Sequence, residues 1–342
     1  MIDLLVVGGG PAGLATAIHA ARAGLSVTVL EPRATPIDKA CGEGLMPGAV
    51  RALERLGVEV AGRPFAGIRY LSADGARTAE ARFRSGHGLG VRRTALHAAL
   101  AARADQLGVR RLAARADGLH SARHAVTAGG LTARHLVAAD GLHSPVRRAL
   151  GLHRPAPGRF PARYGQRRHF ALEPWSDLVE VHWSRHAEAY VTPVADGTVG
   201  VAVLGSERLP FDRQLAAFPA LLRRLGGAQG GPVRGAGPLR QRAGARVRGR
   251  VLLVGDAAGY LDALTGEGVA LALASAEAAV RCLAADRPAA YERAWRRATR
   301  PYRLLTSALL AARHHPWLGP RVVPLAAALP PVFGAAVNLL AR

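Results

Sequence analysis

Three glycines near the N-terminus have the spacing of a phosphate-binding turn. Gly8, Gly10 and Gly13 stand between an apolar run of strand length and a segment with apolar residues at helical spacing. The first glycine permits a tight turn, the second lets a pyrophosphate approach the backbone, and the third lets the helix pack closely on the strand. The helix start, at Pro11 and Ala12, attracts the phosphate charge. The triplet therefore predicts a dinucleotide-binding turn.

A carboxylate follows the next strand-like stretch, as such a turn requires. Glu31 ends the run "LSVTVLE", where its side chain can accept hydrogen bonds from ribose hydroxyls. Because an acidic side chain disfavours a 2′-phosphate, the bound nucleotide is expected to be NAD or FAD. Pro32 and Arg33 follow directly, and we assign them to the same site.

Two later segments distinguish between these nucleotides. They resemble the second and third flavin motifs of the family that contains p-hydroxybenzoate hydroxylase-like monooxygenases, geranylgeranyl reductases and flavin-dependent halogenases. The segments are "AADGLHSPVRRALG" (138–151) and "VLLVGDAAGYLDALTGEGVALALASAEAA" (251–279). The resemblance implies bound FAD. Because the chain has a single dinucleotide fingerprint, NADH or NADPH would bind only transiently as electron donor.

The resemblance also implies roles for individual residues. Asp140 and Gly141, followed by Ser144 and Arg147, would lie beside the flavin and the route of the nicotinamide. Gly255 and Asp256 would hold the ribityl chain, whose hydroxyls suit a carboxylate at the end of a buried parallel strand. The next helix start would direct its N–H groups at the flavin N1–C2 region, where reduced flavin is negatively charged; its residues are Thr265, Gly266, Glu267 and Gly268.

The stretch "VRRTALHAAL" matches the Arg-x-x-Leu-x-x-x-Leu helix start of the same family. This match implies that Arg93 lies near the pyrophosphate or the ribityl chain, with Arg92 as a neighbouring candidate. Alternatively, either arginine is a solvated helix residue.

The loop "PIDKACGEGLMPG" (36–48) holds the only lysine of the chain and one of its two cysteines. Its "KACGEG" core resembles a Cys-Gly loop of geranylgeranyl reductases, in which the cysteine lies near the substrate cavity. Gly42 lets the backbone approach a flat ring closely. Lys39 would then place an ammonium beside the flavin or the substrate, and Cys41 would contact both. Alternatively, Lys39 lies on the surface and Cys41 is a small buried hydrophobe. Cys282 is expected in the core, and no metal is expected.

The stretch "AEAYVTPV" resembles the substrate-side strand of the reductases, which carry a Tyr-x-Trp-x-x-Pro pattern. Tyr190 and Pro193 are present, but Val191 and Thr192 stand between them and the tryptophan is missing. The halogenase Trp-x-Trp-x-x-Pro stretch is also absent. We therefore favour NAD(P)H-dependent hydroxylation of a lipophilic aromatic or polyketide-like molecule, although Gly259 and Ala263 depart from the monooxygenase pattern as well.

The alternative activity is saturation of isoprenoid double bonds, as in geranylgeranyl reductases. In that reaction a hydride would reach one alkene carbon, and Cys41 or Tyr190 would supply the proton. Both activities require an apolar pocket and a lipophilic small-molecule substrate.

The charge suggests a third class of function. The chain carries 46 basic and 24 acidic residues, a net charge of +22, which suits a polyanion or an anionic lipid surface. Only 5% of the residues are aromatic, so nucleic-acid binding by base stacking is not expected. A surface-binding protein with a vestigial flavin fold would purify without flavin colour. No oligomeric state is predicted.

These motifs predict an α/β fold with a discontinuous, Rossmann-type FAD-binding domain like that of p-hydroxybenzoate hydroxylase. Its expected segments are 1–60, 86–155 and 245–290. A mainly antiparallel sheet forms the substrate domain from 61–85 and 156–244, and a C-terminal helical lid covers 291–342.

The lid contains twenty positions without charge, "VVPLAAALPPVFGAAVNLLA" (322–341). That length spans a bilayer, but Pro330 and Pro331 interrupt any single helix, so two short helices over the mouth of the active site are expected. A lid that touches a membrane, helped by Arg303, Arg313 and Arg321, is the alternative. Since no basic region precedes "LLVVGGG", a cytoplasmic location is expected, with or without membrane contact.

Overall fold

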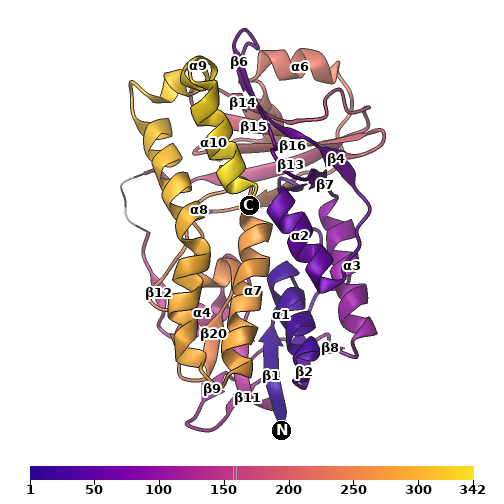
Figure 1. Cartoon of the computed structure of the whole chain (residues 1–342), viewed down its shortest axis with the longest axis vertical. Helices are drawn as coiled ribbons and strands as arrows, with labels where there is room; N and C mark the ends of the chain where they lie inside the picture. The colour runs from indigo at the N-terminus through magenta and orange to yellow at the C-terminus, as the bar shows by residue number, and fades with distance from the viewer. Residues whose placement is uncertain (157, 159) are drawn as a thin grey trace.

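A mostly parallel sheet forms one end of the protein, at the bottom of Figure 1. The structure is a computed structural model that describes residues 1–156, 158 and 160–342. Leu4, Leu5 and Val6 at the sheet centre are fully buried, as expected for a strand covered on both faces. The strands are, in spatial order, β19 (Val247–Arg248), β20 (Val251–Leu253), β11 (Leu131–Ala138), β1 (Ile2–Val7), β2 (Val27–Leu30) and β8 (Arg110–Leu112), with β10 (Val126–Ala128) and β9 (His120–Ser121) beside β11.

Helices cover this sheet and share one core with it. The main ones are α1 (Pro11–Arg22), α3 (Arg93–Gln106), α7 (Gly268–Ala284) and the long α8 (Tyr291–His314). Tyr291 and Trp295 of α8 belong to the core around the parallel sheet, and the Tyr291 hydroxyl donates to the carbonyl of Leu253 at 2.9 Å. The first turns of α8 therefore pack with the nucleotide-binding sheet, although they fall within the segment predicted as a lid.

A seven-stranded sheet forms the other end, at the top of Figure 1. Neighbouring strands are antiparallel except β14 and β5, which are parallel. Ile68 and Tyr70 of β5 point to the interior of the molecule, and Arg69 between them points to the opposite face, because side chains alternate along a strand. The spatial order is β17 (Arg234–Ala236), β13 (Tyr164–Phe170), β16 (Thr198–Gly205), β15 (Ala187–Ala195), β14 (Val179–Trp183), β5 (Gly67–Ser72) and β6 (Thr78–Arg82).

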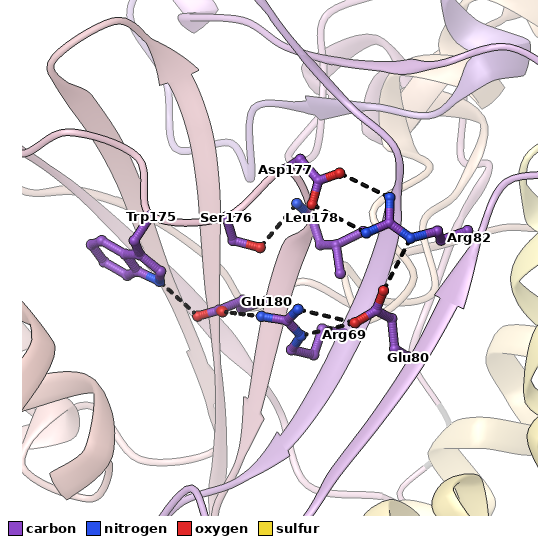
Figure 2. A network of polar contacts seen from close by, with 8 residues as sticks. All are labelled: Arg69, Glu80, Arg82, Trp175, Ser176, Asp177, Leu178 and Glu180. Carbon is purple, nitrogen blue, oxygen red and sulfur yellow. Dashed lines mark hydrogen bonds and ion pairs between the residues drawn. The ribbon is translucent and has the colours of Figure 1, made fainter.

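A polar network on the outer face of this sheet connects β5, β6 and β14 (Figure 2). Arg69 donates to Glu80 at 3.0 Å and to Glu180 at 3.1 Å, and Trp175 donates to Glu180 at 3.0 Å. Burial alone would raise the pKa of Glu180, but the His182 ring, 3.4 Å away, and the hydrogen bond from Trp175 hold this pKa below its usual range. The network fixes the register of three strands whose other face lines the interior.

A small sheet joins the two ends. In it β7 (Gly88–Gly90) pairs with β3 (Gly44–Leu45) and with β4 (Arg63–Phe65). Residues 63–65 thus pair with segments of the predicted FAD-binding domain. The remaining elements are α2 (Pro47–Leu56), α4 (Pro145–Ala149), β12 (His153–Arg154), α5 (Phe211–Leu215), α6 (Pro219–Leu225), β18 (Arg242–Ala243) and the 3₁₀ turns Gly255–Ala258, Pro288–Ala290 and Gly319–Arg321.

The C-terminal segment forms two short helices, as predicted. They are α9 (Val322–Ala328) and α10 (Pro330–Leu340), with the break at the proline pair. Phe333 and Val337 of α10 pack on Ala79 and Ala81 of β6. Among the described residues, no helix is by itself long and apolar enough to cross a membrane. Only Gly319–Ala328 and Pro330–Leu340 taken together reach that length, and they are bent by 103°.

Candidate functional site

A cavity of about 300 Å³ runs from the glycine turn after β1 to the inner face of the seven-stranded sheet. It lies at the carboxyl end of the parallel strands, where ligands bind in folds of this type. The predicted residues that line it are Gly10, Pro11, Ala12, Arg33, Lys39, Cys41, Gly42, Arg93, Asp140, Gly141, Tyr190, Asp256, Thr265, Gly266 and Gly268. The predicted residues that do not line it are Gly8, Gly13, Glu31, Pro32, Arg92, Gly255 and Glu267.

The three glycines of the turn are required for different reasons. A Cβ on Gly13 would lie 1.8 Å from the carbonyl oxygen of Gly8, and one on Gly8 would lie 2.5 Å from that of Ala139, so both are required by packing. A Cβ on Gly10 would meet only Arg93 Nη2, at 4.0 Å, and Gly10 lines the cavity. The open space beside Gly10 is where a pyrophosphate would lie in a turn of this type.

Glu31 lies beside the turn, but its oxygens are engaged. The Gly9 N–H donates to Oε2 at 2.8 Å, and Arg33 donates three hydrogen bonds through its backbone N–H and guanidinium. Burial would raise the pKa of Glu31, yet these hydrogen bonds hold it below its usual range. Ribose hydroxyls would therefore have to displace Arg33, whose side chain is 57% exposed and free to rotate outward.

The two arginines at the start of α3 differ in position. Arg93 is buried and lines the cavity next to Gly10. Arg92 is the N-cap residue of α3, and its Nε is buried without a hydrogen-bond partner among the described residues. Of the pair, only Arg93 lines the cavity, so it is the arginine that would reach a pyrophosphate beside Gly10.

The segment after β11 reaches the cavity through four residues, Ala139, Asp140, Gly141 and Leu142. Asp140 Oδ2 accepts from the Val146 N–H at 3.0 Å, and Oδ1 is buried without a hydrogen-bond partner in the part of the chain that is described. Burial raises the pKa of Asp140. Arg147, which the resemblance placed beside the flavin, is instead fully buried behind the wall and donates to the carbonyls of Leu142 and Ala257 at 2.9 and 3.0 Å.

Asp256 and the start of α7 form the opposite wall. Gly255, with φ +56°, brings the backbone against Ala12, since a Cβ there would lie 2.8 Å from the Ala12 Cβ. Gly266 and Gly268 line the cavity, so the free N–H groups of this helix start face it. Glu267 is 7% exposed and turns away from the cavity, and burial raises its pKa to about 8.

Replacing Glu267 with glutamine is expected to change the pH dependence of stability. The pKa is 4.5 in the unfolded chain and about 8 in the folded one, so Glu267 weakens folding progressively as the pH rises from 4.5 to 8. Glu267→Gln should therefore be more stable than the parent at pH 8, by up to about 4 kcal/mol, and equal to it near pH 4.5. Urea unfolding across this range measures the effect. Equal shifts for Glu267→Gln and for the exposed control Glu54→Gln would contradict it.

Buried charges clamp the loop that carries Lys39 and Cys41. Arg167 of β13 donates to Asp38 Oδ1 at 2.5 Å, and His169 of the same strand contacts Glu43 Oε2 at 2.5 Å. Glu43 Oε1 also accepts from the Arg93 N–H at 2.7 Å. The loop is thereby fixed at both ends, to the seven-stranded sheet and to α3.

Within this clamp, Lys39 and Cys41 both line the cavity. Lys39 Nζ lies over Gly141, 3.3 Å from where a Cβ of that residue would be, and no hydrogen bond or ion pair to Nζ occurs among the described residues. Cys41 Sγ accepts from the Glu43 N–H at 3.4 Å, and burial raises the pKa of the thiol. The site therefore presents an unpaired ammonium and a neutral thiol to its interior.

The far half of the cavity is apolar. Tyr190 lies at its edge and donates its hydroxyl to the carbonyl of Leu264 at 2.7 Å, and burial raises its pKa well above the usual value. Thr192 lines the cavity and donates to the Gly42 carbonyl at 2.8 Å, whereas Val191 packs on the opposite face of the strand. The other apolar walls come from Met46, Phe65, Ile68, Tyr70, Val179, Val181, Leu204, Leu264, Val337 and Leu340. Cys282 is buried in the core.

Several residues that line the cavity were not predicted from the sequence. Glu43 and Tyr260 could have been, because they adjoin the recognised motifs. Glu43 adopts φ +59°, unusual for any residue but glycine, which marks a constrained position. Arg167, Phe65 and Tyr70 carry no local signal, because only long-range strand pairing brings them to the cavity.

These features define a class of protein. A nucleotide turn, a carboxylate at the second buried strand and a helix start facing one cavity belong to flavoproteins with a Rossmann-type domain. Residues 1–194 match the FAD binding domain family. The chain belongs to this family and is an FAD-dependent oxidoreductase. Gly10, Arg93 and the α7 start are the residues that would hold the cofactor.

Relatives and solved structures agree with this assignment. The menaquinone reductase of Mycobacterium tuberculosis is 31% identical over 314 residues, which covers 82% of this chain and 76% of the relative. That of Mycolicibacterium smegmatis is 31% identical over 343 residues, covering 86% and 79%. The fold is similar to a flavoprotein/dehydrogenase from Cytophaga hutchinsonii, with a TM-score of 0.85, 17% identity, and coverage of 99% of this chain and 92% of that one.

Proposed function

We propose that this protein uses NADH or NADPH to reduce a carbon–carbon double bond in a lipid-soluble isoprenoid substrate, with a prenylated quinone such as menaquinone as the first candidate. One observation carries the proposal: the half of the cavity beyond the loop with Lys39 and Cys41 is apolar and extends to the inner face of α10, through Val337 and Leu340. The two menaquinone reductases that are 31% identical to this chain support a quinone-linked substrate.

Reduction of an alkene needs a hydride and a proton. Bound FAD, once reduced, supplies the hydride. Cys41 is the residue that would deliver the proton, since it lines the cavity and its raised pKa keeps the thiol protonated at neutral pH. Tyr190 is less suited, because its hydroxyl proton is held by the Leu264 carbonyl.

Other residues would stabilise charge and exclude water. The N–H groups at the start of α7 and the ammonium of Lys39 face the cavity, where they would favour the negative charge of the reduced cofactor. The apolar walls around Phe65, Tyr70 and Val179 would exclude water from the reacting carbons.

The proposal is tested by incubating purified protein with NADPH or NADH and a panel of isoprenoids, quinones and phenols, with and without air. A reductase is expected to add two hydrogen atoms to a prenylated substrate without oxygen. A product that gains one oxygen atom, formed only in air, would contradict it. That outcome would support the hydroxylase reading, which the missing tryptophan beside Tyr190 favours.

Replacing Cys41 with alanine tests the proton donor. We expect kcat for the reduced product to fall about 100-fold, the lower end for loss of a general acid, while reduction of the bound flavin by NAD(P)H stays unchanged. Stopped-flow spectroscopy separates the two half-reactions. The matched control, Cys282→Ala, alters a buried cysteine away from the cavity and should leave both rates intact. Equal rates of product formation in Cys41→Ala and the parent would exclude Cys41 as donor.

A further inference from the structure

The helix α10 is apolar on both of its faces. Phe333 and Val337 are buried against β6, whereas Val332 and Leu339 on the opposite side are 63% and 42% exposed. A helix that is apolar all round is normally buried within a protein or a membrane. This one lies at the surface of the molecule, in the yellow segment at the upper left of Figure 1.

The single polar side chain of α10 points inward. Asn338 accepts from the Arg84 N–H at 2.8 Å and donates to the carbonyl of Arg82 at 3.1 Å. The Asn338 amide thus bonds to the end of β6 and to the segment just after it, and not to solvent. The solvent side of α10 presents no polar side chain to water.

The exposed apolar surface continues beyond α10. We call it the apolar C-terminal face and define it by Trp317, Leu325, Leu329, Val332 and Leu339, which are 38–63% exposed. Exposed apolar side chains that gather on one segment mark an interaction site. At the edge of the face, the guanidinium of Arg321 lies 4.5 Å from the ring centre of Trp317. Tryptophan with arginine is the pair found where a protein meets lipid headgroups.

The charge close to this face is positive. From residue 315 to residue 342 the sequence contains Arg321 and Arg342 and no aspartate or glutamate, and the whole chain has a net charge of +22. Arg51 adds a guanidinium from the body of the protein, where it donates to the Ala341 carbonyl just after α10 at 3.2 Å. Arginines around an apolar face complement a surface of anionic lipid headgroups.

The shape of the helix pair fits lying on a membrane rather than crossing it. With 11 residues, α10 is about 16 Å long, about half the hydrocarbon thickness of a bilayer. The 103° bend prevents the two helices from adding their lengths. Each can still bury one side in the outer part of a bilayer.

We propose that the apolar C-terminal face docks on the surface of an anionic phospholipid bilayer. The inner side of α10 lines the cavity through Val337 and Leu340, so docking brings the substrate half of the cavity within one helix of the lipid. The docking itself is independent of the reaction, whereas its use for substrate entry rests on the proposed function.

The test compares FAD-loaded parent protein with Leu329→Glu/Val332→Glu in sedimentation with vesicles of phosphatidylcholine or of phosphatidylcholine with phosphatidylglycerol. The parent should bind the anionic vesicles, more weakly in high salt, and the double variant at least 10-fold more weakly. The control Leu222→Glu alters another exposed leucine, 40% exposed on α6, and should bind like the parent. Retained flavin absorbance shows that the variants are folded.

Two results would overturn the proposal: parent protein that stays in the supernatant, or a double variant that binds as the parent does. The second would mean that arginine charge alone causes attachment. A separate activity assay distinguishes failure of membrane docking from failure of the proposed reaction. With short-chain menaquinone in detergent, the parent and the double variant should reduce the substrate at equal rates. With menaquinone in vesicles, the double variant should reduce it more slowly than the parent. Inactivity of both in detergent would contradict the proposed function and leave the vesicle result standing.

Discussion

Replacing Gly10 with valine is expected to give a folded protein that does not retain FAD. The position has room for a side chain in the chain itself, since a Cβ would meet only Arg93 Nη2, at 4.0 Å. The same side chain would fill the space beside the helix start where the pyrophosphate fits. We expect the affinity for FAD to fall at least 100-fold, which corresponds to about 2.7 kcal/mol. Visible flavin absorbance and titration with added FAD measure it.

Two other glycines serve as controls for this variant. Gly13→Val should fail to fold, because a Cβ there would lie 1.8 Å from the Gly8 carbonyl oxygen. Gly334→Ala adds a methyl group on α10, where no atom lies within 4 Å, and should keep both fold and flavin. A folded Gly10→Val protein that binds FAD like the parent would show that the cofactor does not use this turn.

Replacing Glu188 with alanine is expected to give a folded protein that has lost a large part of its stability. The side chain of Glu188 is fully buried and accepts hydrogen bonds from Arg163 and Arg313. Arg163 also lies 3.6 Å from Asp262, and these carboxylates hold the pKa of Arg163 above its usual value despite burial. Without Glu188, two buried guanidinium groups lose their main partner. Breaking a buried pair in this way costs about 3–5 kcal/mol.

The measurement is urea unfolding of the FAD-loaded protein, followed by circular dichroism. Asp177→Ala is the matched control. It removes a carboxylate that is 58% exposed and paired with Arg82, an interaction worth about 1 kcal/mol or less. A loss below 1 kcal/mol for Glu188→Ala would mean that the buried pair only offsets its own desolvation. Arg313 belongs to α8 and Glu188 to β15, so the same variant should loosen the contact between these two elements.

Local patterns account for the nucleotide half of the fold. The turn at Gly8–Gly13 and the strand before Asp256 depend on residues adjacent in sequence, so their periodicity and glycine spacing were sufficient to predict them. The break at Pro330 was predictable for the same reason, because proline removes a backbone donor. The parallel pairing of β5 with β14 could not be predicted, because Ile68 and Val179 are distant in sequence and no local pattern indicates their contact.

The candidate site likewise combines residues that local patterns predict with residues that only long-range contacts bring together. Lys39 and Cys41 were found because their types are rare in this composition, and the structure brings both to the cavity. The clamp that positions them depends on Arg167 and His169 of β13, two residues in a chain rich in arginine, and no spacing marked them. Arg147 was misplaced because a motif gives the segment but not the direction of the side chain, which here points to backbone carbonyls.

The central claim is that the apolar half of the cavity receives an isoprenoid that is reduced without oxygen. The most direct measurement mixes protein whose flavin has been reduced by NADPH, in an oxygen-free stopped-flow instrument, with short-chain menaquinone in detergent, and follows flavin absorbance and the product by mass spectrometry. The account predicts reoxidation of the flavin under nitrogen, with a product that has gained two hydrogen atoms in its side chain. A flavin that stays reduced until air is admitted, with one oxygen atom added to the product, would contradict it.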